Sequence, residues 1–146
     1  MIDSNWIIRK AKGSDLPFIY STWVDSFRYD SSLGKSCRNS IFFPNYNQVV
    51  DHILTQPDTE VLVSVKPDSD ETIFGYLVHQ GSVFHYAFTK EAFRKRGIAK
   101  SLFLHAGGVP ESTFTHRTFE FDPIFKKHVT LLYNPFILFN KSGEKK

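Results

Sequence analysis

The sequence predicts an α/β (α+β) fold, with a mixed and mostly antiparallel sheet flanked by helices. Apolar residues recur at helical spacing near the N-terminus, alternate with a period of two through residues 60–89, and return to helical spacing after a basic loop that contains glycine. At 146 residues the chain has the size of one domain. We therefore expect one domain over residues 1–140 and a polar C-terminal tail over residues 141–146.

The N-terminal elements follow from apolar spacing and turn residues. Residues 5–11 (NWIIRKA) alternate well enough for a first strand. Asp15 is placed to cap a helix that has Pro17 in its first turn and helical apolar spacing over residues 16–28. The polar, serine-rich run from Tyr29 to Asn45 predicts a long loop, and long loops in compact domains are often functional.

A second short helix is expected over residues 47–56, and a period-two pattern follows it. Turn residues divide this pattern into three strands that form an antiparallel meander. The strands are predicted at residues 60–66, 72–79 and 83–89.

The C-terminal part begins with a helix at residues 98–106, which ends at two glycines. A fifth strand is expected at residues 112–118, on the far side of this crossover. A short helix is predicted at residues 122–127, and residues 129–139 are strand material broken by the Asn134-Pro135 pair.

Composition excludes several classes of protein. Charged residues make up 23% and aromatic residues 16%, which argues against disorder. No stretch approaches the roughly 18 apolar residues of a membrane span, and the N-terminus lacks the apolar core of a signal peptide. We therefore expect a soluble, cytoplasmic protein. With only Cys37 and six histidines that lack ligand spacing, we expect no metal site.

The segment Arg94–Ala99 (RKRGIA) lies between a predicted strand and a predicted helix, which is the geometry of an anion site. The first amides of a helix point outward at its positive end, and Gly97 would let the backbone approach a phosphate closely. Arg94 and Arg96 can add charge-assisted hydrogen bonds. The net charge of +3 fits a polyanionic ligand as well as nucleic acid. Taken alone, the segment fits a solvated basic turn equally well.

Residues 89–99 (TKEAFRKRGIA) resemble the run V-x-P-x-Y-R-x-x-G-I-G of the GCN5-related N-acetyltransferase (GNAT) superfamily. They align with it without a gap and contain R-x-x-G-x-A, a permitted form of the family's Q/R-x-x-G-x-G/A signature. The departures are Thr89, Glu91, Phe93 and Ala99. Residues 8–16 are similar to the family's I-R-x-A-x-x-x-D-L pattern. Four short runs also look like acetyltransferase-like proteins encoded by bacteriophages: YSTW at 20–23, HY at 85–86, THRT at 115–118 and YNPF at 133–136.

The resemblance implies a sheet that splays between its fourth and fifth strands and binds acetyl-CoA, the acyl donor, there. The pantetheine arm would pair with the backbone of Ala87, Phe88 and Thr89, whose amides would also polarise the thioester carbonyl. The pyrophosphate would lie on the amides of Arg94, Lys95, Arg96, Gly97, Ile98 and Ala99.

The implied reaction is direct attack of an amine on the acetyl thioester, which needs a deprotonated amine and a protonated leaving thiolate. Tyr133 is the nearest candidate for the acid, with an interior aromatic as the alternative. His116 and His85 are candidates for the base because imidazole titrates near neutrality. For each, a hydrogen-bonded structural histidine is the alternative. Val83 lies near the position where some family members carry a glutamate base.

The acceptor pocket is expected between the first helix and the loop after it, from Trp23, Arg28, Tyr29 and Asp30. The spacing of Trp23 also fits the core. The resemblance implies a primary amine as acceptor, in a small molecule or a protein lysine. One alternative is a GNAT-fold phage protein that modifies a nucleobase in DNA, although basic and aromatic strips on the surface are not evident beyond residues 90–100 and 141–146. Another is a non-catalytic CoA-binding protein. Either a monomer or a homodimer fits the sequence.

Overall fold

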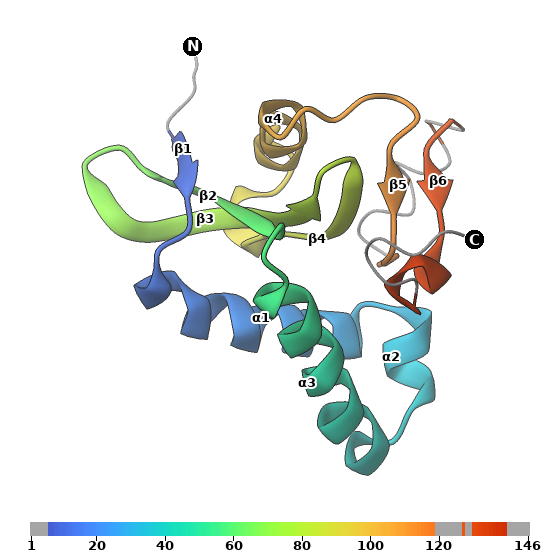
Figure 1. The fold of residues 1–146 in the computed structure, drawn as a ribbon. Coiled ribbons are helices and arrows are strands. Elements are labelled where there is room, and N and C mark those ends of the chain that lie inside the picture. The colour runs from blue at the N-terminus through green and yellow to red at the C-terminus, as the bar shows by residue number, and fades with distance from the viewer. Residues whose placement is uncertain (1–5, 119–126, 128–129, 140–146) are drawn as a thin grey trace.

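The computed structural model describes residues 6–118, 127 and 130–139, which form a six-stranded sheet with helices on both faces (Figure 1). The strands lie in the order β1-β2-β3-β4-β5-β6. The first four pair antiparallel, whereas β4 with β5 and β5 with β6 pair parallel. The predicted mixed, mostly antiparallel α/β fold is confirmed.

The strands are β1 Ile7–Lys10, β2 Glu60–Lys66, β3 Ser69–Gln80, β4 Val83–Thr89, β5 Thr113–Phe114 and β6 Leu132–Tyr133. The α-helices are α1 Leu16–Tyr29, α2 Ser32–Ser36, α3 Asn39–Thr55 and α4 Ile98–His105. Short 3₁₀ helices are η1 Gly13–Asp15, η2 Glu91–Phe93 and η3 Pro135–Phe139. Among the described residues, no helix is both long and apolar enough to cross a membrane.

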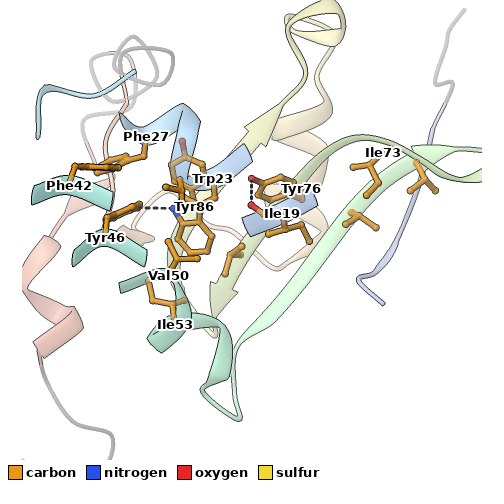
Figure 2. Close-up of a cluster of buried hydrophobic side chains, with 14 residues drawn as sticks. Ile19, Trp23, Phe27, Phe42, Tyr46, Val50, Ile53, Ile73, Tyr76 and Tyr86 are labelled. Atoms are coloured by element: carbon orange, nitrogen blue, oxygen red, sulfur yellow. Dashed lines mark hydrogen bonds between the residues drawn. The ribbon is translucent and has the colours of Figure 1, made fainter. Parts of the chain in front are cut away.

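The core has two halves, because the sheet is covered on both faces. Helices α1 and α3 lie against one face and α4 lies against the other (Figure 1). Side chains alternate along the central strands: Tyr76 of β3 packs in the half that contains α1 and α3, and Leu77 packs beside α4. The α1–α3 half is rich in stacked aromatic rings, which include Trp23, Phe27, Phe42, Tyr46 and Tyr86 (Figure 2).

A β-bulge in β4 reverses which face its side chains point to. Val78 pairs with Tyr86 and His79 pairs with Phe84, so His85 is the extra residue of the bulge. Because of this insertion, Phe84 packs beside α4 while Tyr86, two positions later, packs against α1 and α3.

The bulge lies where β4 and β5 separate. Parallel pairing joins Val83 to Thr113 and Phe84 to Phe114, and the amide of Thr115 then donates to the Phe84 carbonyl at 3.0 Å. Beyond this point, β4 continues to Thr89 with β3 as its only strand partner among the described residues. The sheet therefore splays between its fourth and fifth strands, as predicted.

The long loop predicted from Tyr29 to Asn45 is wrong, because this segment contains α2 and the first turns of α3. Phe42 and Tyr46 lie one turn apart on the buried face of α3, so their burial favours the helix. Pro44 lies inside this helix, where it removes one hydrogen-bond donor at a point close to the helix start. The short helix predicted at residues 47–56 is the second half of α3.

Asp15 lies at the N-cap position of α1, as predicted, but its side chain makes no capping hydrogen bond to the helix. Its carboxylate instead accepts from the Lys12 amide at 2.7 Å and from Arg9 Nη1 at 2.8 Å, which ties β1 to the turn before the helix. The flanking charge and the amide hydrogen bond lower the pKa of Asp15 despite an opposing effect of burial, which is the largest single influence.

The C-terminal strands are shorter than predicted. Among the described residues, the strand expected at 112–118 is formed only by Thr113 and Phe114, and the strand expected at 129–139 only by Leu132 and Tyr133. A 3₁₀ helix follows from Pro135, with Asn134 Oδ1 accepting from the Phe136 amide at 3.1 Å. The helix predicted at residues 122–127, apart from Lys127, and the tail at 141–146 lie outside the described residues.

Candidate functional site

The turn between β4 and α4 has an unusual backbone. Lys95 has a φ of 67° and Gly97 a φ of 88°, so left-handed residues flank Arg96, whose φ is not positive. Such an alternation turns successive amides toward one concave side and is typical of anion-binding nests. A left-handed lysine costs about 1 kcal/mol or more, and strain of this kind is concentrated at functional sites. Arg94 holds the turn in place, because its Nε donates to the Thr89 carbonyl at 3.1 Å.

The amides of this turn have no acceptor in the described part of the protein. The first hydrogen bond of α4 runs from the Ser101 amide to the Gly97 carbonyl at 2.9 Å. The six amides before it, from Lys95 to Lys100, donate to no described residue. Apart from its two chain neighbours, no described residue has a heavy atom within 4 Å of the place where a Gly97 Cβ would stand, so the backbone is open to a ligand there.

Aromatic stacking supports the basic side chains of the turn. The Arg96 guanidinium lies 5.3 Å from the centre of the Phe93 ring, and Phe93 stacks on Phe74 of β3 at 4.3 Å. Arg96 and Lys95 are both exposed at the start of a helix, where positive charge and the helix dipole favour the same anion. These contacts make the turn a fit for a pyrophosphate.

The backbone predicted to bind pantetheine lies at the end of β4. Ala87 and Phe88 are half-buried and pair with Leu77 and Tyr76 of β3, while Thr89 is buried. Their outer edge faces the splay. The role of these three residues in binding an acyl donor stays a prediction.

The two candidate histidines are joined by a network of hydrogen bonds that is buried at Thr115 and reaches the surface at Asp58. Thr115 Oγ1 lies 2.9 Å from His85 Nδ1 and 2.8 Å from His116 Nδ1. On its other side, His85 Nε2 lies 2.6 Å from Gln80 Oε1, and Gln80 Nε2 donates to Asp58 Oδ1 at 2.7 Å. We call Asp58, Gln80, His85, Thr115 and His116 the histidine network.

His116 is enclosed by aromatic rings. Its ring lies 5.0–5.9 Å, centre to centre, from four rings that it meets edge to face, those of Trp23, Phe27, Tyr46 and Tyr86. Desolvation lowers the pKa of His116 to about 3 and the pKa of His85 to about 4. Both rings are therefore neutral at pH 7 and titrate well below neutrality, in contrast to the expectation from free imidazole. Their part in proton transfer stays a prediction.

Tyr133, the predicted acid, lies on β6 opposite Phe114 of β5. Its side chain is 46% exposed, and the Arg117 guanidinium lies 5.5 Å from the centre of its ring. This position is solvent-accessible rather than interior, and its catalytic role stays a prediction.

The residues predicted to contact the acceptor lie around the end of α1, in different environments. Trp23 is fully buried and donates to the Tyr46 hydroxyl at 2.8 Å, so in this structure it supports the site from the core (Figure 2). Arg28 joins α1 to α2 and α3 through Gly34 and Asn39. Tyr29 is 57% exposed under the Arg28 guanidinium, and Asp30 ends α1. Contact of these residues with an acceptor stays a prediction.

Two polar residues at the site were not predicted from the sequence, Thr115 and Gln80, which complete the histidine network. Ser26, another polar residue of α1, has its Oγ 2.6 Å from the Tyr86 hydroxyl. Thr115 directly precedes a candidate histidine, which was the one available signal. In the described residues, no group of three or more histidine, cysteine, aspartate or glutamate side chains could hold a metal ion.

Comparison with solved structures identifies the architecture. The fold is similar to a histone acetyltransferase HPA2 and related acetyltransferase from Corynebacterium glutamicum (14% identity, 70% of each chain, TM-score 0.54). It is also similar to apo-form YjaB from Escherichia coli (17% identity, 73% of this chain and 65% of that one, TM-score 0.51). A third similar structure is a GCN5-related N-acetyltransferase from Rhodopseudomonas palustris (12% identity, 73% and 66%, TM-score 0.50).

The match therefore spans about two thirds of the length of the E. coli and R. palustris proteins. No protein-family model and no curated protein sequence matches this chain. At such identities the likeness establishes the fold alone. The chain has the fold of the GCN5-related N-acetyltransferases, including the splay between β4 and β5.

Proposed function

We propose that this chain is a cytoplasmic N-acetyltransferase that moves an acetyl group from acetyl-CoA to a primary amine. The observation that carries the proposal is the run of six amides, Lys95 to Lys100, that donate to no described residue, on a backbone in which left-handed residues flank Arg96. A pyrophosphate offers the acceptor oxygens that such a run lacks. The GNAT-like fold supports acetyl-CoA as the ligand that brings this pyrophosphate.

The splay gives the acyl end of the donor a place in the sheet. Beyond Phe84, β4 pairs with no strand other than β3 among the described residues, and an extended pantetheine arm could pair with it at Ala87 to Thr89. The donated acetyl group would then lie near the bulge at His85, with the histidine network on one side. In this arrangement the protein's contribution is to orient the thioester and to position groups for the proton transfers of amine attack.

Titration of the purified protein with acetyl-CoA tests the proposal. We expect binding by calorimetry and a rise in melting temperature, and weaker binding of acetyl-pantetheine, which lacks the pyrophosphate. Failure of acetyl-CoA to give either heat or a thermal shift would overturn the proposal. Equal affinity for the two compounds would show that the turn before α4 does not bind the pyrophosphate.

Turnover distinguishes the remaining alternatives. Release of CoA thiol is measured with a polyamine, an amino-acid amide and a lysine peptide as acceptors. Binding of acetyl-CoA without thiol release on any amine favours a non-catalytic CoA-binding protein. Because of the resemblance to phage proteins, DNA is also tested as an acceptor. A change in the mass of a nucleobase favours DNA modification. Nucleic acid is not the favoured acceptor, because the basic turn is accounted for by pyrophosphate.

A further inference from the structure

The hydrogen bonds of the histidine network determine which nitrogen of each ring carries its proton. Gln80 Nε2 donates to the Asp58 carboxylate, so the amide of Gln80 is oriented with Oε1 toward His85. An amide oxygen accepts only, and it lies 2.6 Å from His85 Nε2. Nε2 of His85 must therefore be the protonated nitrogen.

The same reasoning continues inward from His85. A neutral imidazole protonated at Nε2 has a bare Nδ1, so the Thr115 hydroxyl donates to His85 Nδ1 at 2.9 Å. Burial keeps the ring neutral, since it lowers the pKa of His85 to about 4. The single hydroxyl hydrogen of Thr115 is then used, and its oxygen can only accept from the second ring.

His116 is the last residue in this series of hydrogen bonds. Its Nδ1 lies 2.8 Å from Thr115 Oγ1, so Nδ1 carries the hydrogen and Nε2 is bare. Within the described residues, His116 Nε2 has no hydrogen-bond partner. In water a neutral histidine has no neighbour to select this form, whereas here the four residues behind the ring select it together.

We infer that Asp58, Gln80, His85 and Thr115 are positioning residues that hold His116 as its Nδ1–H tautomer and leave Nε2 as the nitrogen able to accept a hydrogen bond. The tautomer follows from the structure alone. Its use, in which Nε2 accepts an N–H of the incoming amine, rests on the proposed acetyl transfer. A ring that stays neutral at pH 7 suits this use, because only a neutral imidazole has a bare nitrogen that can accept a hydrogen bond from the amine.

The tautomer is measured directly by long-range ¹H–¹⁵N correlation on the full-length protein with ¹⁵N-labelled histidine at pH 7. For His116 we expect a protonated-type shift at Nδ1 and an unprotonated-type shift at Nε2, and the reverse pattern for His85. The opposite assignment at either ring would overturn the inference.

Two substitutions at Thr115 separate the hydroxyl from the shape of the side chain. Thr115→Val keeps the shape and removes the hydroxyl, so we expect His116 to shift toward the Nε2–H form. Thr115→Ser keeps the hydroxyl and should retain the wild-type pattern. Thr113→Val, two positions earlier on β5, is the matched control and should also retain it. An unchanged pattern in a folded Thr115→Val protein contradicts the inference.

Gln80→Leu gives a second test from the outer end of the network, at a half-buried position. We expect His85 to lose its fixed Nε2–H form, and this variant decides the question if Thr115→Val does not fold.

In the acetylation assay, Thr115→Val should lower kcat about tenfold or more with an unchanged KM for acetyl-CoA. If the protein does not bind acetyl-CoA, the proposed acetyl transfer and this kinetic test fail, but the inferred tautomer is unaffected. If the protein binds acetyl-CoA and His116 has the other tautomer, the inference fails and the proposed function is unaffected.

Discussion

His85 Nδ1 lies 2.9 Å from Thr115 Oγ1, across the point where β4 and β5 part. His85 is also the extra residue of the bulge in β4. One residue therefore both bends the strand away from its neighbour and bridges the opening with its side chain. Bulges are common beside active sites because they re-aim a side chain at little cost to the rest of the sheet. The splay is therefore formed by the bulge in β4 and stabilised by the hydrogen bond from the same residue.

Replacement of Gly97 by alanine should weaken binding of acetyl-CoA. The added Cβ meets no protein atom within 4 Å, but it would stand where the backbone is open to the pyrophosphate. We expect the affinity to fall about tenfold, which corresponds to about 1.4 kcal/mol. Isothermal titration with acetyl-CoA measures the change.

Gly107→Ala is the matched control for this substitution. Gly107 has a φ of 87° against 88° for Gly97, its Cβ position is equally open, and it lies at the other end of α4. Both variants should lose about 1–2 kcal/mol of unfolding free energy through left-handed alanine. Only Gly97→Ala should lose affinity, and an equal loss in both would show that the effect is one of stability.

Gly34→Ala should destabilise the protein, because α2 packs too closely on α1 to admit a side chain. A Cβ at Gly34 would lie 2.2 Å from the Phe27 carbonyl oxygen, which is backbone and cannot rotate away. We expect a loss of about 1–3 kcal/mol in urea unfolding. Gly13→Ala, with no atom within 4 Å and no positive φ, should leave the stability unchanged or slightly higher. Comparable losses in the two variants would refute close packing at α2.

Much of the sheet could be predicted because its pattern is local. The bounds of β2 and β4 agree with the predicted strands residue for residue, and α4 differs by one residue at its end. Alternation with a period of two and flanking turn residues contain the required information. The turn at Gly97 was likewise predicted from a local signal, a glycine in a basic run between a strand pattern and a helix pattern.

The missed features depend on contacts between distant segments. The composition of Tyr29 to Asn45 predicts a loop, yet Phe42 forms an aromatic cluster with Phe27 and Tyr46, and this packing outweighs the local preference. The low pKa of His116 likewise comes from rings on α1, α3 and β4, which no short motif reveals. The position of the bulge, and with it the hydrogen bond between His85 and Thr115, can be predicted only when the pairing of the strands is known.

Tyr46→Phe should cost more stability than its small change in volume suggests. Trp23 Nε1 donates to the Tyr46 hydroxyl at 2.8 Å in the buried core, and phenylalanine would leave that indole N–H without an acceptor (Figure 2). We expect a loss of about 1–3 kcal/mol in urea unfolding. Tyr20→Phe is the control, because the Tyr20 hydroxyl contacts Asp51 at the surface and its loss should cost less than about 1 kcal/mol. Equal losses would contradict the burial of this pair.

The stability of the protein should fall as the pH drops from about 6.5 to about 5, above the pKa values of most carboxylates. His85 and His116 have folded pKa values of about 4 and about 3, below the unfolded value, so in this window the unfolded state binds more protons and acid favours it. Each histidine should account for about 2 kcal/mol between pH 6.5 and pH 5. Urea unfolding at these two pH values measures the slope, which His85→Gln should reduce and His105→Gln, at an exposed site on α4, should not. A slope that is the same in all three proteins would show that His85 does not stay neutral in the folded state, and would remove the physical basis for a fixed tautomer at His116.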